Sequence, residues 1–92
     1  MSIATSVKKI LIADDEPDIL EIIQYNLQKE GYEVITAKNG SEAIDMAIKN
    51  RPDLIILDIM MPGKNGIEVC NLLRLKPVFN ETLIVFLTAL SD

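Results

Sequence analysis

Three aspartates directly follow two short apolar segments, and their type and spacing suit metal chemistry. Asp14 and Asp15 come after the segment at residues 9–13, and Asp58 follows the apolar run at residues 54–57. Strands of one parallel sheet point their carboxyl ends at the same rim, so neighbouring strands here would bring the three carboxylates together. Carboxylates in close proximity destabilise each other's ionised forms. A hard divalent cation relieves this repulsion, because it prefers oxygen ligands.

The rest of the sequence excludes several classes of reaction for such a site. The chain has no histidine, which excludes a Ser-His-Asp triad, and its one cysteine, Cys70, excludes an internal disulfide and a cysteine-rich zinc site. It has no glycine-rich phosphate loop with a lysine. An acidic metal pocket remains suited to phosphoryl transfer through an aspartyl phosphate. In this interpretation Asp58 attacks, Asp14 and Asp15 hold Mg²⁺, and Thr88 hydrogen-bonds a phosphoryl oxygen.

The same residues also have plainer structural interpretations. A lone aspartate just past a strand is usually a turn or N-cap residue, and Asp58 alone would be assigned that role. The second strand that ends in acids argues against it, because a generic turn seldom contains adjacent acids that repel. For Thr88 taken alone, capping of the next helix is the stronger interpretation. Cys70 is best explained as a small core hydrophobe on a helix.

Length and composition indicate one small domain over residues 1–92, with residues 1–7 as a loosely held tail. Hydrophobic residues make up 49% of the 92 residues, enough for a core, and aromatic residues only 4%. The net charge of -5 and the lack of a basic stripe argue against direct nucleic-acid contact. No signal peptide is evident, and no apolar run is long enough to span a membrane. We therefore expect a cytoplasmic protein with no membrane contact.

Hydrophobic periodicity and turn residues predict short strands that alternate with single helices. Expected strands are residues 9–13, 32–37, 54–58 and 82–87, and expected helices are about 17–30, 40–50 and 66–75, with a loop at 76–81. The first helix is expected to bury a stripe and the second helix a face, and the third to bury some of its apolar residues. These sets are Ile19, Leu20, Ile22, Ile23 and Leu27 for the first, Ala43, Ile44, Ala47 and Ile48 for the second, and Ile67, Val69, Cys70, Leu72 and Leu73 for the third. Such alternation implies an α/β fold with a parallel sheet and right-handed crossovers.

Three longer motifs carry a family resemblance. The chain contains, in this order, LIADDEP at residues 11–17, LIILDIMMPGKNG at 54–66 and IVFLTA at 84–89. With them, from about Lys8 to its C-terminus, it resembles the receiver domain of bacterial two-component response regulators. The resemblance implies a flavodoxin-like doubly wound sheet with strand order 2-1-3-4. The general observation that ligands bind at the carboxyl ends of such strands is itself based in part on a chemotaxis member of this family.

The resemblance also implies roles for individual residues. It implies Mg²⁺ bound by Asp15, Asp58 and the backbone carbonyl of Met60, with Asp14 acting partly through water. It implies phosphorylation of Asp58 by a phosphohistidine on a sensor histidine kinase or a phosphotransfer protein. Thr88 is implied to be the switch hydroxyl. The domain would then be a phosphoacceptor rather than an enzyme, with autocatalytic phosphotransfer and dephosphorylation at most.

Two features depart from the family pattern. Receivers usually continue with a fifth strand and two more helices, and place a phosphate-contacting Lys-Pro pair and an aromatic switch residue there. The 92 residues contain none of these, and Lys76-Pro77 lies before the fourth strand, in the wrong place. The fourth strand is therefore expected to be an uncharged edge, covered either by further receiver residues or by another chain through self-association.

Two other classes of function stay open at the level of sequence. One is a metal-dependent phosphatase with an aspartate nucleophile, although such enzymes resemble a pattern with a second aspartate two residues on, where this chain has Met60. The other is an interaction module that works without phosphorylation, because the phosphate-contacting lysine is absent. The sequence names no cognate kinase and no output domain.

Overall fold

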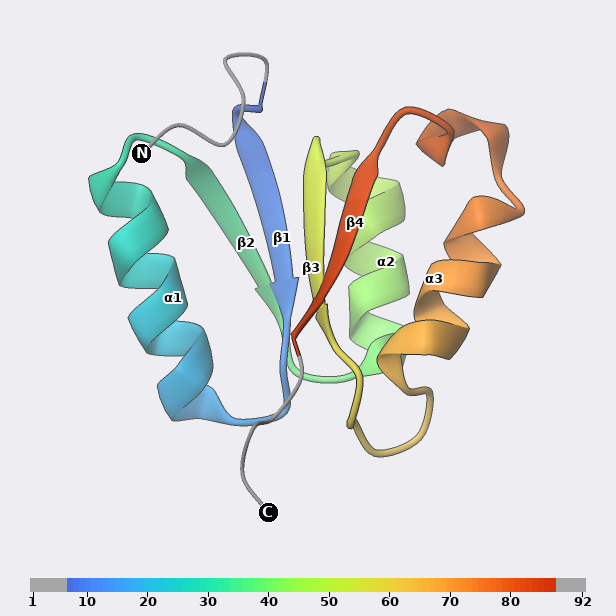
Figure 1. The fold of residues 1–92 in the computed structure, drawn as a ribbon, viewed down its shortest axis with the longest axis horizontal. Helices are drawn as coiled ribbons and strands as arrows, with labels where there is room; N and C mark the ends of the chain where they lie inside the picture. The colour runs from blue at the N-terminus through green and yellow to red at the C-terminus, as the bar shows by residue number, and fades with distance from the viewer. Residues whose placement is uncertain (1–6, 88–92) are drawn as a thin grey trace.

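A computed structural model describes residues 7–87, which form four strands that alternate with three α-helices (Figure 1). Their bounds differ from the expected ones by at most one residue. In chain order the elements are β1 (Lys9–Ala13), α1 (Pro17–Lys29), β2 (Glu33–Ala37), α2 (Gly40–Asn50), β3 (Leu54–Asp58), α3 (Gly66–Arg74), a 3-10 helix η1 (Pro77–Phe79) and β4 (Leu83–Leu87).

The four strands form one parallel sheet in the order β2-β1-β3-β4. Strand β1 lies at the reversal of strand order, between β2 and β3. Strand β3 pairs with β4 in a register that sets Asp58 opposite Leu87. The predicted flavodoxin-like topology is therefore confirmed, and it places the carboxyl ends of β1 and β3 side by side.

Helices cover both faces of the sheet, with α1 on one side and α2 and α3 on the other (Figure 1). Alternate residues of each strand point to opposite faces, so β1 and β3 supply apolar side chains to two separate core clusters. The cluster under α2 and α3 includes Leu11, Ala13, Ile55, Leu57, Val69 and Leu73, and the cluster under α1 includes Ile10, Ile12, Leu20 and Leu54. Strand β3 is thus largely buried on both faces, as its apolar run predicts.

The expected stripe on α1 is only partly buried. Leu20 is buried and Ile23 and Leu27 are half-buried, but Ile19 and Ile22 are exposed, Ile22 by 58%. Helical geometry explains the error: Ile22 lies about 160° round the helix from Leu20, so both cannot face one flat sheet. On α2, Ile48 is likewise exposed, where a buried position was expected.

Two further expectations are corrected at the amino end of the strands. Val7 was assigned to a loose tail, but it is buried against the cluster under α1. The expected loop at residues 76–81 contains η1, whose Phe79 is 1% exposed and packs in the larger core. Arg74 fixes this turn, because its guanidinium donates to the carbonyl oxygens of Phe79 and Thr82 at 2.6 and 2.9 Å.

Strand β4 forms one edge of the sheet and is poorly covered. Leu83, Val85 and Phe86 are exposed by 49%, 46% and 41%, although the strand contains no charged residue. The edge expected from the sequence is therefore present among the described residues. None of the helices in the described part of the chain combines the length and the apolar character that crossing a membrane requires.

Candidate metal centre at the carboxyl ends of β1 and β3

Asp58 is the last residue of β3, where the strand leaves the core and reaches the rim of the sheet. Its side chain is 9% exposed, so the carboxylate is largely removed from water without being sealed from it. The backbone N–H of Met60 donates to Asp58 Oδ1 at 3.1 Å. This bond, together with the rigid strand, fixes the direction of the carboxylate.

Asp14 and Asp15 follow β1, the strand next to β3. The N–H of Asp14 donates to the carbonyl oxygen of Ala37 at the end of β2, at 3.1 Å, and this continues the sheet pairing by one residue. Asp14 is 5% exposed, and its Oδ1 accepts the N–H of Glu16 at 2.9 Å. Asp15 is exposed. The pair therefore offers one fixed, buried carboxylate and one that reaches solvent.

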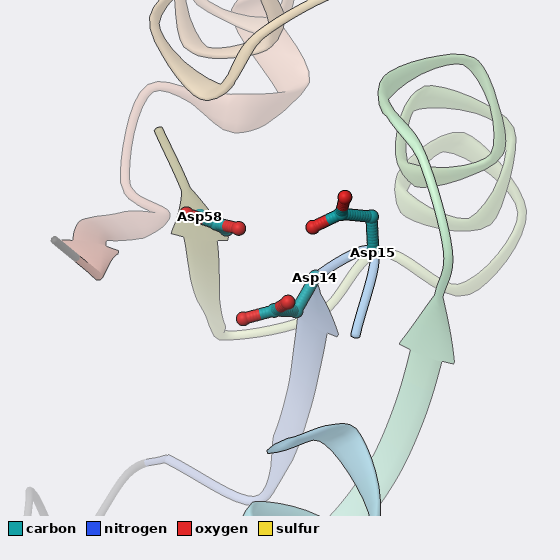
Figure 2. A group of neighbouring side chains, drawn as sticks. All are labelled: Asp14, Asp15 and Asp58. Atoms are coloured by element: carbon teal, nitrogen blue, oxygen red, sulfur yellow. The ribbon is translucent and has the colours of Figure 1, made fainter. Parts of the chain in front are cut away.

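The three carboxylates converge on one space, as the sequence predicts. One oxygen from each of Asp14, Asp15 and Asp58 can be chosen so that all lie within 4.8 Å of one another. Figure 2 shows the three side chains approaching from the ends of two adjacent strands. This spacing allows a single ion to contact all of them, and hard cations such as Mg²⁺ take oxygen ligands of this kind.

Electrostatics at Asp58 favour a bound cation. Burial is the largest cause that raises the pKa of Asp58, the charges of Asp14 and Asp15 raise it further, and the Met60 N–H acts in the opposite direction. The main causes of this shift include no lysine or arginine. A divalent cation would supply the missing positive charge, so the donor set fits the metal that the sequence predicts.

The other predicted site residues are only partly placed. Met60 lies two residues beyond Asp58, with its N–H on the carboxylate and its side chain exposed. The role of its carbonyl as a metal ligand stays a prediction. Thr88 lies outside the described residues, so its role as a hydroxyl donor also stays a prediction.

The loop from β3 to α3 contains residues that the sequence reasoning did not connect with the site. Met61 is buried in the larger core and anchors the loop. Asn65 and Glu68 form a capping box at the start of α3, with bonds of 2.9 and 3.0 Å. The spacing Asn65-x-x-Glu68 was a visible signal for this cap. Gly66 is buried, and its N–H donates to the carbonyl oxygen of Ile59 at 3.1 Å.

This fold and site define a class of protein. Residues 10–92 match the model of the response regulator receiver domain, and the chain belongs to this family. It is therefore a receiver domain of the two-component response regulators, a family of signalling modules that bind Mg²⁺ at an acidic pocket and typically interact with histidine kinases or phosphotransfer proteins.

Individual relatives agree with this assignment. The chain is 55% identical over 67 residues to the alkaline phosphatase synthesis transcriptional regulatory protein PhoP of Bacillus subtilis, covering 73% of this chain but only 28% of that protein. Chemotaxis protein CheY4 of Vibrio cholerae is 37% identical, with a TM-score of 0.87 over 95% of this chain and 72% of that chain. Response regulator TrrA of Thermotoga maritima, solved in complex with Mg²⁺-BeF, is 48% identical, with a TM-score of 0.84 over 91% of this chain and 71% of that chain.

Proposed function

We propose that this domain accepts a phosphoryl group on Asp58 from the phosphohistidine of a sensor histidine kinase or a phosphotransfer protein, with Mg²⁺ bound by Asp14, Asp15 and Asp58. The observation that carries the proposal is the convergence of one carboxylate oxygen from each of the three aspartates, all within 4.8 Å of one another. The pKa of Asp58 is raised in this cluster. The carbonyl of Met60 is proposed as a further metal ligand. The bound ion would neutralise charge on the carboxylates and on the incoming phosphoryl oxygens.

Asp58, Met60 and Thr88 are proposed to have separate roles in the transfer. An oxygen of Asp58 forms a bond to phosphorus while the phosphorus–nitrogen bond of the phosphohistidine breaks, and the imidazole leaves with the electron pair and takes a proton from water. The Met60 N–H holds Oδ1 of Asp58, so the other oxygen is the one free to attack. The hydroxyl of Thr88 is proposed to donate to a phosphoryl oxygen of the product. The role is that of a signalling phosphoacceptor in the cytoplasm, and not of an enzyme with turnover.

The relative in complex with Mg²⁺-BeF supports this proposal over the two alternatives. A phosphatase of the aspartate-nucleophile type would need a second acid two residues after Asp58, where Met60 stands. An interaction module that works without phosphorylation would have no use for an acidic trio that costs stability. The matched residues span 28% of the length of the curated relative PhoP.

Trapping of the aspartyl phosphate tests the proposal. The chain is incubated with a small-molecule phosphodonor and Mg²⁺, and the acyl phosphate is trapped and mapped by mass spectrometry. We expect the label on Asp58, its loss in Asp58→Asn, and its retention in Asp53→Asn, which changes an aspartate at the other end of β3. Label that persists at the wild-type level in Asp58→Asn would sink the assignment.

We also propose that the 92-residue chain self-associates through β4 unless further receiver residues cover that strand. On its outer edge β4 pairs with no other strand among residues 7–87, and three of its apolar side chains, Leu83, Val85 and Phe86, are exposed. Sedimentation and hydrogen exchange of the 92-residue chain test this. A stable monomer with slow exchange along residues 83–87 would show that the edge needs no partner.

A further inference from the structure

The loop that follows Asp58 closes on itself at Gly66. The N–H of Gly66 donates to the carbonyl oxygen of Ile59 at 3.1 Å, so the first residue of α3 lies against the end of β3. A Cβ on Gly66 would overlap the carbonyl oxygen of Asp58. It would also lie 3.0 Å from the carbonyl carbon of Asp58 and 3.1 Å from Cα of Ile59. These are backbone atoms, which cannot rotate aside as a flexible side chain can.

Both elements that meet here are firmly held. Strand β3 pairs with β1 and β4 and is buried on both faces. Val69 and Leu73 of α3 are fully buried in the larger core, and the capping box of Asn65 and Glu68 fixes the first turn of that helix. A side chain at position 66 would therefore displace the loop that joins the two elements, and this loop includes the Met60 N–H, which holds the Asp58 carboxylate.

We propose that Gly66 is a positioning residue for the phosphoacceptor. It acts by letting α3 lie against the Asp58 carbonyl, so that the carboxylate keeps its direction toward Asp14 and Asp15. This inference rests on the proposed function of Asp58, but its metal-binding consequence can be measured without phosphorylation. Misplacement of a reacting group by about 1 Å costs about 100-fold in rate, so a small displacement of the Asp58 carboxylate should be visible in the kinetics.

The chain offers a matched control in Gly40, the first residue of α2. A Cβ on Gly40 would overlap the carbonyl oxygen of Lys64 and lie 2.7 Å from Cβ of Lys64 and 3.0 Å from Cγ2 of Val69. It would therefore disturb the same loop at Lys64, and no atom of Asp58 is among the three that it would approach most closely. Both glycines are buried, so alanine at either position should cost stability.

The experiment compares Gly66→Ala and Gly40→Ala with the wild-type chain. Three quantities are measured: the free energy of unfolding, the affinity for Mg²⁺, and the initial rate of phosphorylation by a small-molecule donor at saturating Mg²⁺. We expect both variants to be less stable. The rate or the Mg²⁺ affinity of Gly66→Ala should fall by about tenfold or more, whereas both should stay within about threefold of wild type in Gly40→Ala.

The remaining outcomes decide against the proposal. Gly66→Ala with lowered stability but wild-type rate and Mg²⁺ affinity would show a purely structural role. Equal losses in the two variants would show that loop integrity, not the position of Asp58, matters. If Gly66→Ala does not fold, the measurements are repeated in an excluded osmolyte that favours the folded state. A variant that stays unfolded there while Gly40→Ala folds also overturns the proposal.

Failure of the proposed function gives a different pattern. A wild-type chain that takes up no phosphoryl group would refute the role of Asp58 as acceptor. The Mg²⁺ titrations of Gly66→Ala and Gly40→Ala would then decide the positioning role alone.

Discussion

Strand β3 carries an aspartate at each end, and the two differ in almost every physical respect. Asp53, just before the strand, is exposed, and its Oδ2 accepts the N–H groups of Lys8 and Lys9, both at 3.0 Å. These bonds are the largest cause that lowers the pKa of Asp53. Asp58, at the other end, is buried beside two further carboxylates, and its pKa is raised.

The comparison shows that surroundings, not residue type, decide which acid can serve chemistry. The charge of Asp53 is already balanced by backbone donors and the nearby Lys9, and it joins the start of β1 to the start of β3. The charge of Asp58 is left unbalanced by the described residues, so the folded domain retains an unfavourable interaction that a cation can relieve. Asp53 at the amino end of β3 therefore stabilises the fold, whereas Asp58 at the carboxyl end has an unfavourable charge that cation binding would relieve.

Removal of the acid at the carboxyl end should abolish stabilisation by Mg²⁺. Mg²⁺ at 100 times its dissociation constant should stabilise the wild-type chain by about 2.7 kcal/mol through linkage. Asp53→Asn should keep this gain, whereas Asp58→Asn should lose most of it. Urea unfolding with and without Mg²⁺ measures the difference, and an equal gain in all three proteins would contradict the comparison.

The two acids after β1 should differ in their effect on Mg²⁺ affinity. Asp15 is expected to be a direct ligand and Asp14 to act partly through water. Asp14→Asn should therefore cost about the tenfold typical of an outer-sphere group, and Asp15→Asn more than that. Isothermal titration of both variants tests the order. Equal affinity in wild type and Asp15→Asn would remove Asp15 from the site.

Removal of the acid at the amino end should weaken the fold and leave the site intact. Asp53→Ala deprives two N–H groups of their acceptor, and because solvent reaches them, we expect a loss of about 1 kcal/mol. Asp53→Asn retains an acceptor oxygen and should lose less. Asp58→Asn should instead raise stability when Mg²⁺ is absent. Chemical denaturation of the three variants shows whether each one gains or loses free energy of unfolding relative to wild type. A loss of stability in Asp58→Asn would contradict the inference that the Asp58 charge destabilises the fold when Mg²⁺ is absent.

The convergence of the three carboxylates could be predicted from the sequence because its signals are local. An apolar run followed by acids marks both the strand and the rim, and Asp14, Asp15 and Asp58 meet as expected. The strand order followed from the family resemblance and is confirmed.

Contacts that depend on the folded chain, and not on a local residue pattern, set the limits of that prediction. Asp53 accepts bonds from residues more than 40 positions away, and nothing local indicates this. Burial of Phe79 depends on the 3-10 turn and on Arg74, which bonds the carbonyl of Thr82 eight residues on. The close approach of Gly66 to the backbone of Asp58 is likewise set by the packing of α3.

The pH dependence of stability should show the smallest effect, and it should have opposite sign at the two ends of β3. The pKa of Asp53 is lowered from its ordinary value of 3.8, so its stabilisation is fully present above that value and is lost as the pH falls through the folded pKa. The pKa of Asp58 is raised, so without Mg²⁺ its penalty is absent below 3.8 and grows as the pH rises through the folded pKa. Denaturation of wild type, Asp53→Asn and Asp58→Asn across the acidic range separates the two. The wild-type advantage over Asp53→Asn should shrink toward low pH, and the advantage of Asp58→Asn over wild type should grow as the pH rises. If the stability of wild type minus that of the variant changed with pH in the same direction for Asp53→Asn and Asp58→Asn, the two aspartates would not have oppositely shifted pKa values.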